Sequence, residues 1–211
     1  MAAVVAITSS LQAQDKKQNE KDKPVVAEKK TEKDKPVAKE DAKNKPHSQE
    51  ELDEWMKAAG PGENHKKLDM LVGTWNLSIK YSGEGMTEFK GKSEFKWVME
   101  GRFLVETTKT DMAGHLFEWM GWHGYDNRNK QFVSVWADNF DTGIETMTGK
   151  FDDATKTLTY AGESENPEKG GKVKVKWIMR LESKDRFTTE MYENAGNGHE
   201  DKVMEIVATR G

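Results

Sequence analysis

The sequence predicts an all-β fold, an antiparallel up-and-down β-barrel of about ten strands. After residue 72, apolar and polar residues alternate with a period of two, and clusters of turn-forming residues recur at short intervals. No helical segment interrupts these runs, so parallel crossover connections are excluded and neighbouring strands are antiparallel. A meander of this many strands usually closes on itself, because closure removes its unpaired edges.

Composition limits both the size of the core and the range of partners. The chain has 211 residues and a mean hydropathy of -0.90, so part of its length cannot be core. Six of its seven tryptophans follow residue 70, where enough chain remains to bury a sizeable core. The net charge of -4 is mild and Lys and Glu are interspersed, which predicts no nucleic-acid partner and no binding to anionic lipid; no membrane span is expected either. The absence of Cys excludes disulfides and thiolate chemistry.

The first 47 residues are expected to lie outside the folded domain. Residues 1–14 open with an apolar run and resemble a truncated secretory signal peptide, although no Lys or Arg precedes the run. Residues 15–47 lack aromatic residues and repeat Lys-Asp-Lys-Pro-Val, so they are predicted to be a disordered Lys/Glu/Pro-rich linker. A signal peptide implies export to the periplasm or cell envelope. The alternative is a disordered start on a cytoplasmic protein.

Residues 48–72 predict a short helical lead-in to the barrel. Ser48 with Glu51 three positions later forms a capping-box pattern, and the helix is expected to end at Gly60-Pro61-Gly62. A second helical turn, Glu63 to Leu71, leads into the first strand and is placed to cap one end of the barrel. The apolar residues that share one face of the first helix are Leu52, Trp55, Met56 and Ala59.

The barrel domain is predicted to span residues 73–211. Its opening run places Trp75, Leu77, Ile79 and Tyr81 on one face of a strand and polar residues on the other, as a half-buried strand requires. Later strands are rich in Val, Thr, Phe, Trp and Tyr. The turn clusters between them start at Gly83, Glu100, Asp111, Asp126, Asp141, Asp152, Asn166, Ser183 and Ala195.

Gly73, Trp75 and Arg210 form a candidate closure between the first and last strands. The pair resembles the barrel-closing Trp and Arg of lipocalin-like proteins, in which the Arg covers the face of the Trp. The physical basis is a desolvated cation-π contact, with the guanidinium free to bond backbone carbonyls. The role is structural rather than catalytic.

A longer stretch resembles the bacterial family catalogued as domain of unknown function 1579, which implies a lipocalin-like (calycin-type) barrel. The matching pieces run in order from residue 61 to residue 210, and the Lys-rich linker lies outside them. They are Pro61 to Leu68, Val72 to Trp75, Gly101 to Leu104, Gly124 to Asn127, Trp136 to Asp138, Asp141 to Gly143, Lys202 to Ile206 and Thr209-Arg210. The resemblance implies a fold but no activity.

The histidines do not form a recognisable catalytic or metal site. His65 lies near a helix end, where a capping role is usual, and His199 lies in a turn. His115 and Glu118 are three apart on a strand and point to opposite faces. His123 shares a face with aromatic residues. We therefore predict no catalytic residue, no metal ligand and no cofactor; haem, which some related small barrels bind, would need an inward-facing His115 or His123.

Six residues are candidates for contacting a ligand because alternation or a family motif places them among apolar neighbours. They are Trp136, Asp138, Glu205, Glu118, His65 and Tyr125. If the carboxylates face inward, burial raises their pKa and fits them to orient a ligand or move a proton. The alternative is that Glu118 and Glu205 face solvent, and that Asp138 ends its strand by accepting turn amides.

The predicted function is binding of a small apolar or aromatic ligand in the barrel interior. It rests mainly on fold analogy, supported by strands rich in Trp and Met. One alternative is an enzyme of isomerase or hydrolase type, with His65, Asp138 or Glu205 as acid or base. Another is a structural envelope protein whose barrel is filled by side chains. The sequence leaves the oligomeric state open.

Overall fold

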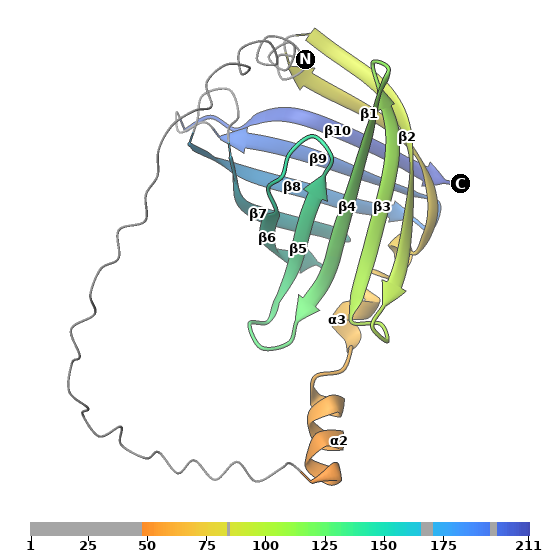
Figure 1. Cartoon of the computed structure of the whole chain (residues 1–211), viewed down its shortest axis with the longest axis vertical. Helices are drawn as coiled ribbons and strands as arrows, with labels where there is room; N and C mark the ends of the chain where they lie inside the picture. The colour runs from red at the N-terminus through yellow and green to blue at the C-terminus, as the bar shows by residue number, and fades with distance from the viewer. Residues whose placement is uncertain (1–47, 84, 166–170, 195–197) are drawn as a thin grey trace, which may run out of the picture.

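The described residues fold into a closed antiparallel barrel with two short helices at one end (Figure 1). The computed structural model describes residues 48–83, 85–165, 171–194 and 198–211. Ten strands follow the order β1-β10-β9-β8-β7-β6-β5-β4-β3-β2 around the barrel, so each strand pairs with its sequence neighbours and β1 pairs with β10. The predicted fold class is confirmed. The predicted signal peptide, residues 1–14, and the predicted linker, residues 15–47, lie outside the described residues.

The element bounds follow the turn clusters of the sequence. The lead-in consists of α2 (Gln49–Ala58), α3 (Glu63–Lys66) and a 3-10 turn, η1 (Asp69–Leu71). The strands are β1 (Gly73–Gly83), β2 (Gly85–Val98), β3 (Phe103–Met112), β4 (His115–Asp126), β5 (Gln131–Asp138), β6 (Glu145–Asp152), β7 (Thr157–Glu165), β8 (Lys172–Ser183), β9 (Arg186–Asn194) and β10 (Asp201–Arg210).

The core lies inside the barrel because each strand sends alternate side chains inward. On β1, the predicted inward residues Trp75, Leu77 and Ile79 are 0%, 4% and 1% exposed. The same alternation continues around the barrel, so the interior combines aromatic and aliphatic side chains from every strand with a small set of polar ones. The helical lead-in adds Leu68 and Leu71, which are fully buried and plug one end.

The two helices differ in how much of their surface they bury. α2 begins with the predicted capping box, in which Glu51 N–H donates to Ser48 Oγ at 3.2 Å and Ser48 N–H donates to Glu51 Oε2 at 2.8 Å. It nevertheless buries none of its residues. α3 and η1 pack against the barrel end, although Val72, at the entry to β1, stays 37% exposed. Within the described residues, no helix is both long and apolar enough to cross a membrane.

The predicted contact between the first and last strands is present. The Arg210 guanidinium lies 3.8 Å from the Trp75 ring centroid, and Nη1 donates to the Val72 carbonyl at 2.6 Å. Gly73 has φ +118°, and a Cβ there would lie 2.8 Å from Arg210 Nη1, so only glycine fits. Arg210 thus ties the C-terminal strand to the entry of β1 and closes this end of the barrel.

Candidate functional site

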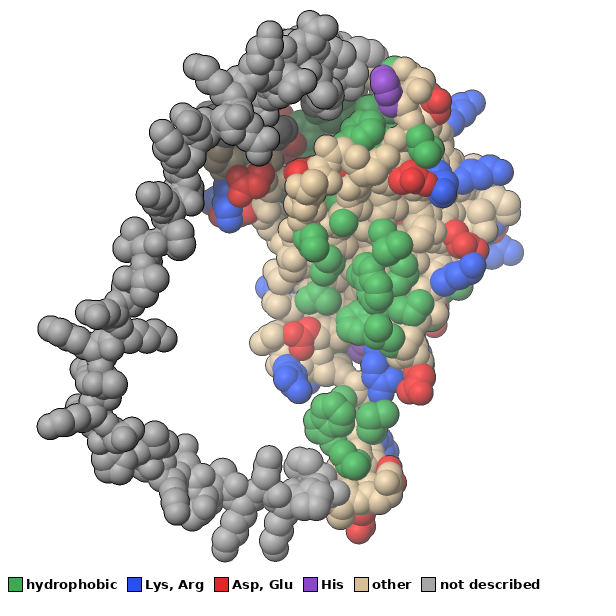
Figure 2. Space-filling view, in the orientation of Figure 1, with side chains coloured by type: hydrophobic (Ala, Val, Ile, Leu, Met, Phe, Trp, Pro, Cys, Tyr) green, Lys and Arg blue, Asp and Glu red, His purple; other side chains and the backbone are tan. Residues whose placement is uncertain are grey.

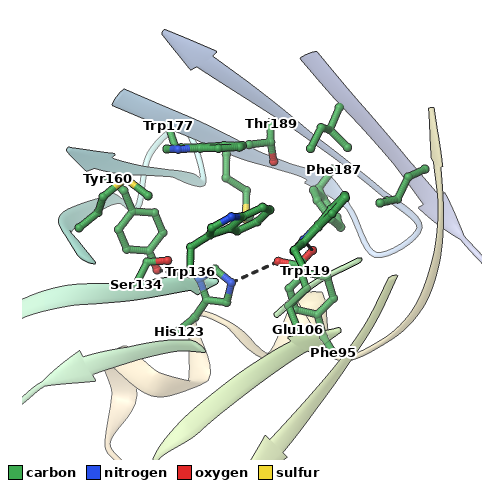
Figure 3. A pocket seen from close by; sticks show the side chains of 14 residues that line it. Phe95, Glu106, Trp119, His123, Ser134, Trp136, Tyr160, Trp177, Phe187 and Thr189 are labelled. Carbon is green, nitrogen blue, oxygen red and sulfur yellow. Dashed lines mark hydrogen bonds and ion pairs between the residues drawn. The ribbon is translucent and has the colours of Figure 1, made fainter. Parts of the chain in front are cut away.

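A cavity of about 50 Å³ lies inside the barrel and is lined by inward side chains from all ten strands. It lies between the Trp75 closure at one end and the turns at the opposite end of the barrel. One wall is aromatic and sulfur-containing, and the other carries a cluster of polar groups (Figure 3). By volume it has room for a few water molecules, since one water needs roughly 10–15 Å³.

Three tryptophans from β4, β5 and β8 form the aromatic wall. Trp119 stacks on Trp136 with centroids 5.1 Å apart and planes at 27°, and Trp136 faces Trp177 at 5.9 Å and 32°. Each ring reaches the interior because alternate residues of a barrel strand point inward, and each of these three tryptophans occupies an inward position. The wall is therefore built by residues that are far apart in sequence and meet only when the barrel closes.

Glu106, on β3, is the charged group of the polar wall. It is 9% exposed, and its Oε1 accepts hydrogen bonds from Ser93 Oγ at 3.1 Å, Thr108 Oγ1 at 3.0 Å and Trp119 Nε1 at 3.0 Å. Burial by itself raises the pKa of Glu106, but the hydrogen bond and charge of His123, with the bonds from Trp119 and Thr108, outweigh it. The net pKa lies below the usual value, so the carboxyl is ionised.

His123 connects Glu106 to a tyrosine from the other side of the barrel. Its Nε2 lies 3.4 Å from Glu106 Oε2, and its Nδ1 lies 3.4 Å from the Tyr160 hydroxyl. A carboxylate only accepts, so Nε2 carries the proton shared with Glu106, and in the neutral ring Nδ1 accepts from Tyr160. Burial raises the pKa of Tyr160 far above its usual value, so the phenol remains protonated; it donates to Nδ1 when the imidazole is neutral and accepts from Nδ1–H when the imidazole is charged.

Gly121 leaves the space in which Glu106 and His123 meet. It faces the interior between Trp119 and His123 on β4, and a Cβ there would lie 3.1 Å from His123 Nε2 and 3.3 Å from Glu106 Oε2. Both contacts are closer than a side chain usually tolerates. The glycine therefore allows two large polar side chains on neighbouring strands to approach each other.

Trp177 supplies the unsatisfied group of the site. Its Nε1 is buried and has no hydrogen-bond acceptor among the described residues. Within those residues it is the only buried side-chain nitrogen or oxygen without a hydrogen-bond partner. By contrast, Trp119 Nε1 donates to Glu106, and Trp136 Nε1 donates to Asp138 Oδ2 at 3.1 Å. Leaving a buried donor unpaired costs roughly 1–3 kcal/mol, so an acceptor supplied from outside the chain gains from this position.

Two of the six predicted ligand contacts lie near one another on β5. Trp136 lines the cavity. Asp138 has the same inward parity but ends the strand: its Oδ1 accepts from the amides of Phe140 at 2.8 Å and Asp141 at 3.1 Å. It therefore has the turn-ending role that was the alternative expectation, while its Oδ2 orients the Trp136 ring.

The other four candidates lie outside the cavity. Glu118 and Glu205 point outward and pair with Lys109 at 2.5 Å and Lys202 at 2.7 Å, as the solvent-facing alternative required. His65 is buried at the closed end, where Nδ1 accepts from the Gly62 amide at 3.0 Å. Burial and the charge of Arg102 lower the pKa of His65.

Tyr125 packs edge-on against His65, with centroids 6.0 Å apart, and so belongs to the closed end as well. Of the other histidines in the part of the chain that the structure describes, His115 and His199 are exposed and His123 faces the interior. Both His123 ring nitrogens contact Glu106 or Tyr160, and the cavity is far smaller than the roughly 300–1,000 Å³ of pockets that hold drug-sized ligands. The site therefore does not fit haem. The described residues contain no cluster of three or more acidic, His or Cys side chains placed to hold a metal.

The sequence alone does not identify Glu106, Tyr160 or Trp177 as members of one site. In β3, Phe103 and Val105 point to one face of the strand, and Leu104 and Glu106 point to the other. Because both faces hold apolar residues, alternation does not say which face is inside, and Glu106 is naturally interpreted as a surface residue. Tyr160 and Trp177 lie on β7 and β8, distant in sequence from Glu106. The sequence signal for this site was that the charged Glu106 shares a strand face with the apolar Leu104. The partners of Glu106 become evident only when the barrel is closed.

Comparisons with known proteins agree with this architecture. A model of the family described as "Protein of unknown function (DUF1579)" matches residues 60–210. The crystal structure of Rv2717c from M. tuberculosis is similar at 15% identity and a TM-score of 0.54, covering 72% of this chain and 99% of that one. A redesigned β-barrel gives 16% identity and a TM-score of 0.36, covering 69% and 95%. The first similarity supports the fold alone. No curated protein matches the chain.

Proposed function

The chain belongs to the DUF1579 family of proteins of unknown function, and we propose that its barrel binds a small, neutral, largely apolar ligand in the interior cavity. The observation that carries this proposal is the unpaired Nε1–H of Trp177 in the wall of a cavity built from tryptophan rings. A ligand with one hydrogen-bond acceptor and a flat apolar body satisfies both features.

The charge of the cavity selects against anions. Glu106 is an ionised carboxylate held inside the barrel, and its oxygens already accept hydrogen bonds from four side chains. A second buried anion nearby raises the electrostatic energy of both groups. Fatty acids and other carboxylates are therefore poor ligands, and a neutral ketone, ester or amide suits the site.

The cavity in this conformation is smaller than one six-membered ring, so a ligand of that size enters only if lining side chains move. A dry cavity of roughly 150 Å³ holds benzene, whereas this cavity measures about 50 Å³. The lining residues Met147 and Met179 have unbranched thioether side chains that change rotamer easily. We propose that these side chains move to admit the ligand while the tryptophan wall stays in place.

The route of entry is proposed to follow the aromatic side chains at the end opposite the Trp75 closure. Phe140, in the β5–β6 loop, is 44% exposed and packs on Phe117 at 4.6 Å, and Phe117 packs on Trp119 at 5.3 Å. Asp138 binds both this loop and the Trp136 ring. Movement of the loop is therefore coupled to the cavity wall.

The test is a set of matched probes titrated calorimetrically against the full chain. Cyclohexanone carries an acceptor, cyclohexane has none and cyclohexanecarboxylate carries a charge, while the ring is the same. We expect binding in the order cyclohexanone, cyclohexane, cyclohexanecarboxylate. Trp177→Phe removes the donor and should weaken cyclohexanone binding about fivefold, equivalent to about 1 kcal/mol, without weakening cyclohexane binding.

The matched control is Trp55→Phe, which makes the same change at a residue 57% exposed on α2. It should leave all three affinities unchanged. If cyclohexanone and cyclohexane fail to bind, or if the carboxylate binds best, the proposal is wrong. Native mass spectrometry of protein purified from its own host then identifies a retained natural ligand.

A second candidate function is acid–base catalysis in the same cavity. The observation that favours it is the chain of contacts from Glu106 through His123 to Tyr160, which resembles the arrangement in which a carboxylate orients an imidazole. These are not the residues expected from the sequence, since His65, Asp138 and Glu205 do not share a site. In this proposal Glu106 positions His123 through Nε2–H, and His123 Nδ1 takes the Tyr160 hydroxyl proton while that hydroxyl oxygen takes a proton from the ligand.

His123→Gln separates binding from turnover. An enzyme would convert the retained natural ligand, and the variant would bind that ligand but return it chemically unchanged. If the wild-type protein also returns the ligand unchanged after prolonged incubation, only the binding function stands.

We also propose export to the periplasm or cell envelope, supported by the apolar run at residues 1–7 and the small residues that follow it. N-terminal sequencing of the protein from its own host tests this. Protein that begins after residue 10 in the envelope fraction supports export, and intact Met1 on cytoplasmic protein contradicts it.

A further inference from the structure

A groove of about 860 Å³ lies where α2 meets the closed end of the barrel. Three segments of the chain form it: the end of α2 with the link to α3, the β2–β3 turn and the β4–β5 turn. Asn127 Nδ2, in the β4–β5 turn, donates to the Gly60 carbonyl at 2.9 Å and so joins two of its walls. The volume lies within the range of small-molecule sites, roughly 300–1,000 Å³.

The groove has an excess of positive charge. Figure 2 shows Lys and Arg side chains where α2 meets the barrel. The charged side chains that line the groove are four cations and one carboxylate: Lys57, Arg102, Arg128, Lys130 and Asp126. Within the described residues, Lys57, Arg128 and Lys130 have no ion-pair partner. These cations are therefore available to an anion from outside the chain.

The two nearby carboxylates leave this charge largely uncompensated. Asp126 Oδ1 accepts from the Asn129 amide at 3.1 Å and the Arg128 amide at 2.8 Å. The bonds from Asn129, and then the one from Arg128, lower the pKa of Asp126, so its charge is used to hold the turn. Glu100 Oε2 pairs with Arg102 Nη1 at 3.0 Å, but the Glu100 side chain is 80% exposed, and an incoming anion displaces such a pair at little cost.

Aromatic side chains line the same groove as the cations. Trp55, Phe103 and Tyr125 come from α2, β3 and β4. Trp55 is 57% exposed, and Tyr125 packs edge-on against His65 with centroids 6.0 Å apart. A flat ring gains from contact with such side chains, and an anionic group gains from the Arg and Lys side chains beside them.

The closed barrel favours a small molecule over a peptide in this groove. Each strand already pairs with two neighbours, so an extended peptide finds no free sheet edge to join. The net charge of -4 and the small number of cations also distinguish the groove from surfaces that bind nucleic acid.

We propose that this groove binds a small organic phosphate in which a flat ring carries a phosphate monoester. The ring packs on Trp55 and Phe103, and the phosphate binds Arg102, Arg128 and Lys130. A phosphate monoester carries close to two negative charges at neutral pH, and the planar guanidinium of Arg matches its oxygens in pairs. The groove and the interior cavity share no lining residue, so this site is independent of the interior ligand.

The first test titrates the full chain calorimetrically with phenyl phosphate, inorganic phosphate and phenol. Phenyl phosphate should bind most tightly, because it alone carries both the ring and the charge. Arg128→Gln and Lys130→Gln change exposed side chains, so the fold is kept, and each should weaken phenyl phosphate binding about fivefold. Trp55→Leu should weaken the binding of phenyl phosphate and leave that of inorganic phosphate unchanged.

The matched control is Lys150→Gln, which removes the same charge from an exposed position on β6 and should leave all three affinities unchanged. Added salt should weaken phenyl phosphate binding, because the cations are at the surface. The proposal is overturned if phenyl phosphate fails to bind, if it binds no better than inorganic phosphate, or if both charge variants bind it as the wild type does.

The second test locates the ligand on the molecule. The indole Nε1–H resonance of Trp55, assigned by its loss in Trp55→Phe, should shift in a saturable manner on addition of phenyl phosphate. The resonance of Trp177, in the barrel interior, should stay in place. A shift of Trp177 without one of Trp55 would place the ligand inside the barrel and overturn the assignment to the groove.

Discussion

Glu106 carries a negative charge inside the barrel, and its environment explains how the charge is tolerated. Its two oxygens accept hydrogen bonds from Ser93, Thr108, Trp119 and His123. An ionised carboxylate with this many donors is stable only while all of them are in place. The cost of losing the acceptor is high, because buried donors on neighbouring strands then remain unpaired.

Glu106→Gln should lower the free energy of unfolding by about 3 kcal/mol at neutral pH. The folded pKa of Glu106 is lowered from 4.5, so its contribution to stability is present above that pH and is lost as the pH falls through the folded pKa. The difference in stability between wild type and variant should therefore shrink below about pH 4.5. Urea unfolding at several pH values measures this difference. A difference that stays constant to low pH would show that folding does not lower the pKa of Glu106, and a wild type that gains stability relative to the variant as the pH falls would show that the carboxyl is neutral in the fold.

At the scale of elements, the order and faces of the strands follow from alternation and turn residues. The face of β1 and the capping box of α2 were predictable because each depends on local spacing. The contact of Trp75 with Arg210 was expected from the resemblance to lipocalin-like proteins. The inward face of β3 was not predictable, because both faces of this strand hold apolar residues. The exposure of α2 was not predictable either, because the spacing of apolar residues indicates that a helix has an apolar face but does not indicate what covers that face.

Arg210→Lys should destabilise the barrel by about 2 kcal/mol. Lysine keeps the charge but loses the planar guanidinium that stacks on Trp75 and binds the Val72 carbonyl. The measurement is denaturant unfolding followed by tryptophan fluorescence. Arg186→Lys is the control: Arg186 is paired with Glu182 at 2.6 Å on the surface, and its substitution should cost less than about 1 kcal/mol. Equal costs would show that the closure contact adds little.

At the scale of the whole molecule, barrel closure creates the candidate site. Glu106 and His123 come from neighbouring strands, but Tyr160 and Trp177 approach them only because β1 pairs with β10 and completes the ring. For this reason the sequence predicted the architecture and, of the six candidate ligand contacts, one residue of the cavity wall, Trp136, but not the polar network.

The most direct test of interior binding is the indole Nε1–H resonance of Trp177 in a proton–nitrogen correlation spectrum, assigned by its loss in Trp177→Phe. Cyclohexanone should shift this resonance downfield in a saturable manner, because its carbonyl accepts the hydrogen bond that the indole lacks within the described residues. The resonance of Trp55, exposed on α2, should not move. A Trp177 resonance that stays in place while others shift would contradict the proposal that the ligand binds in the barrel interior.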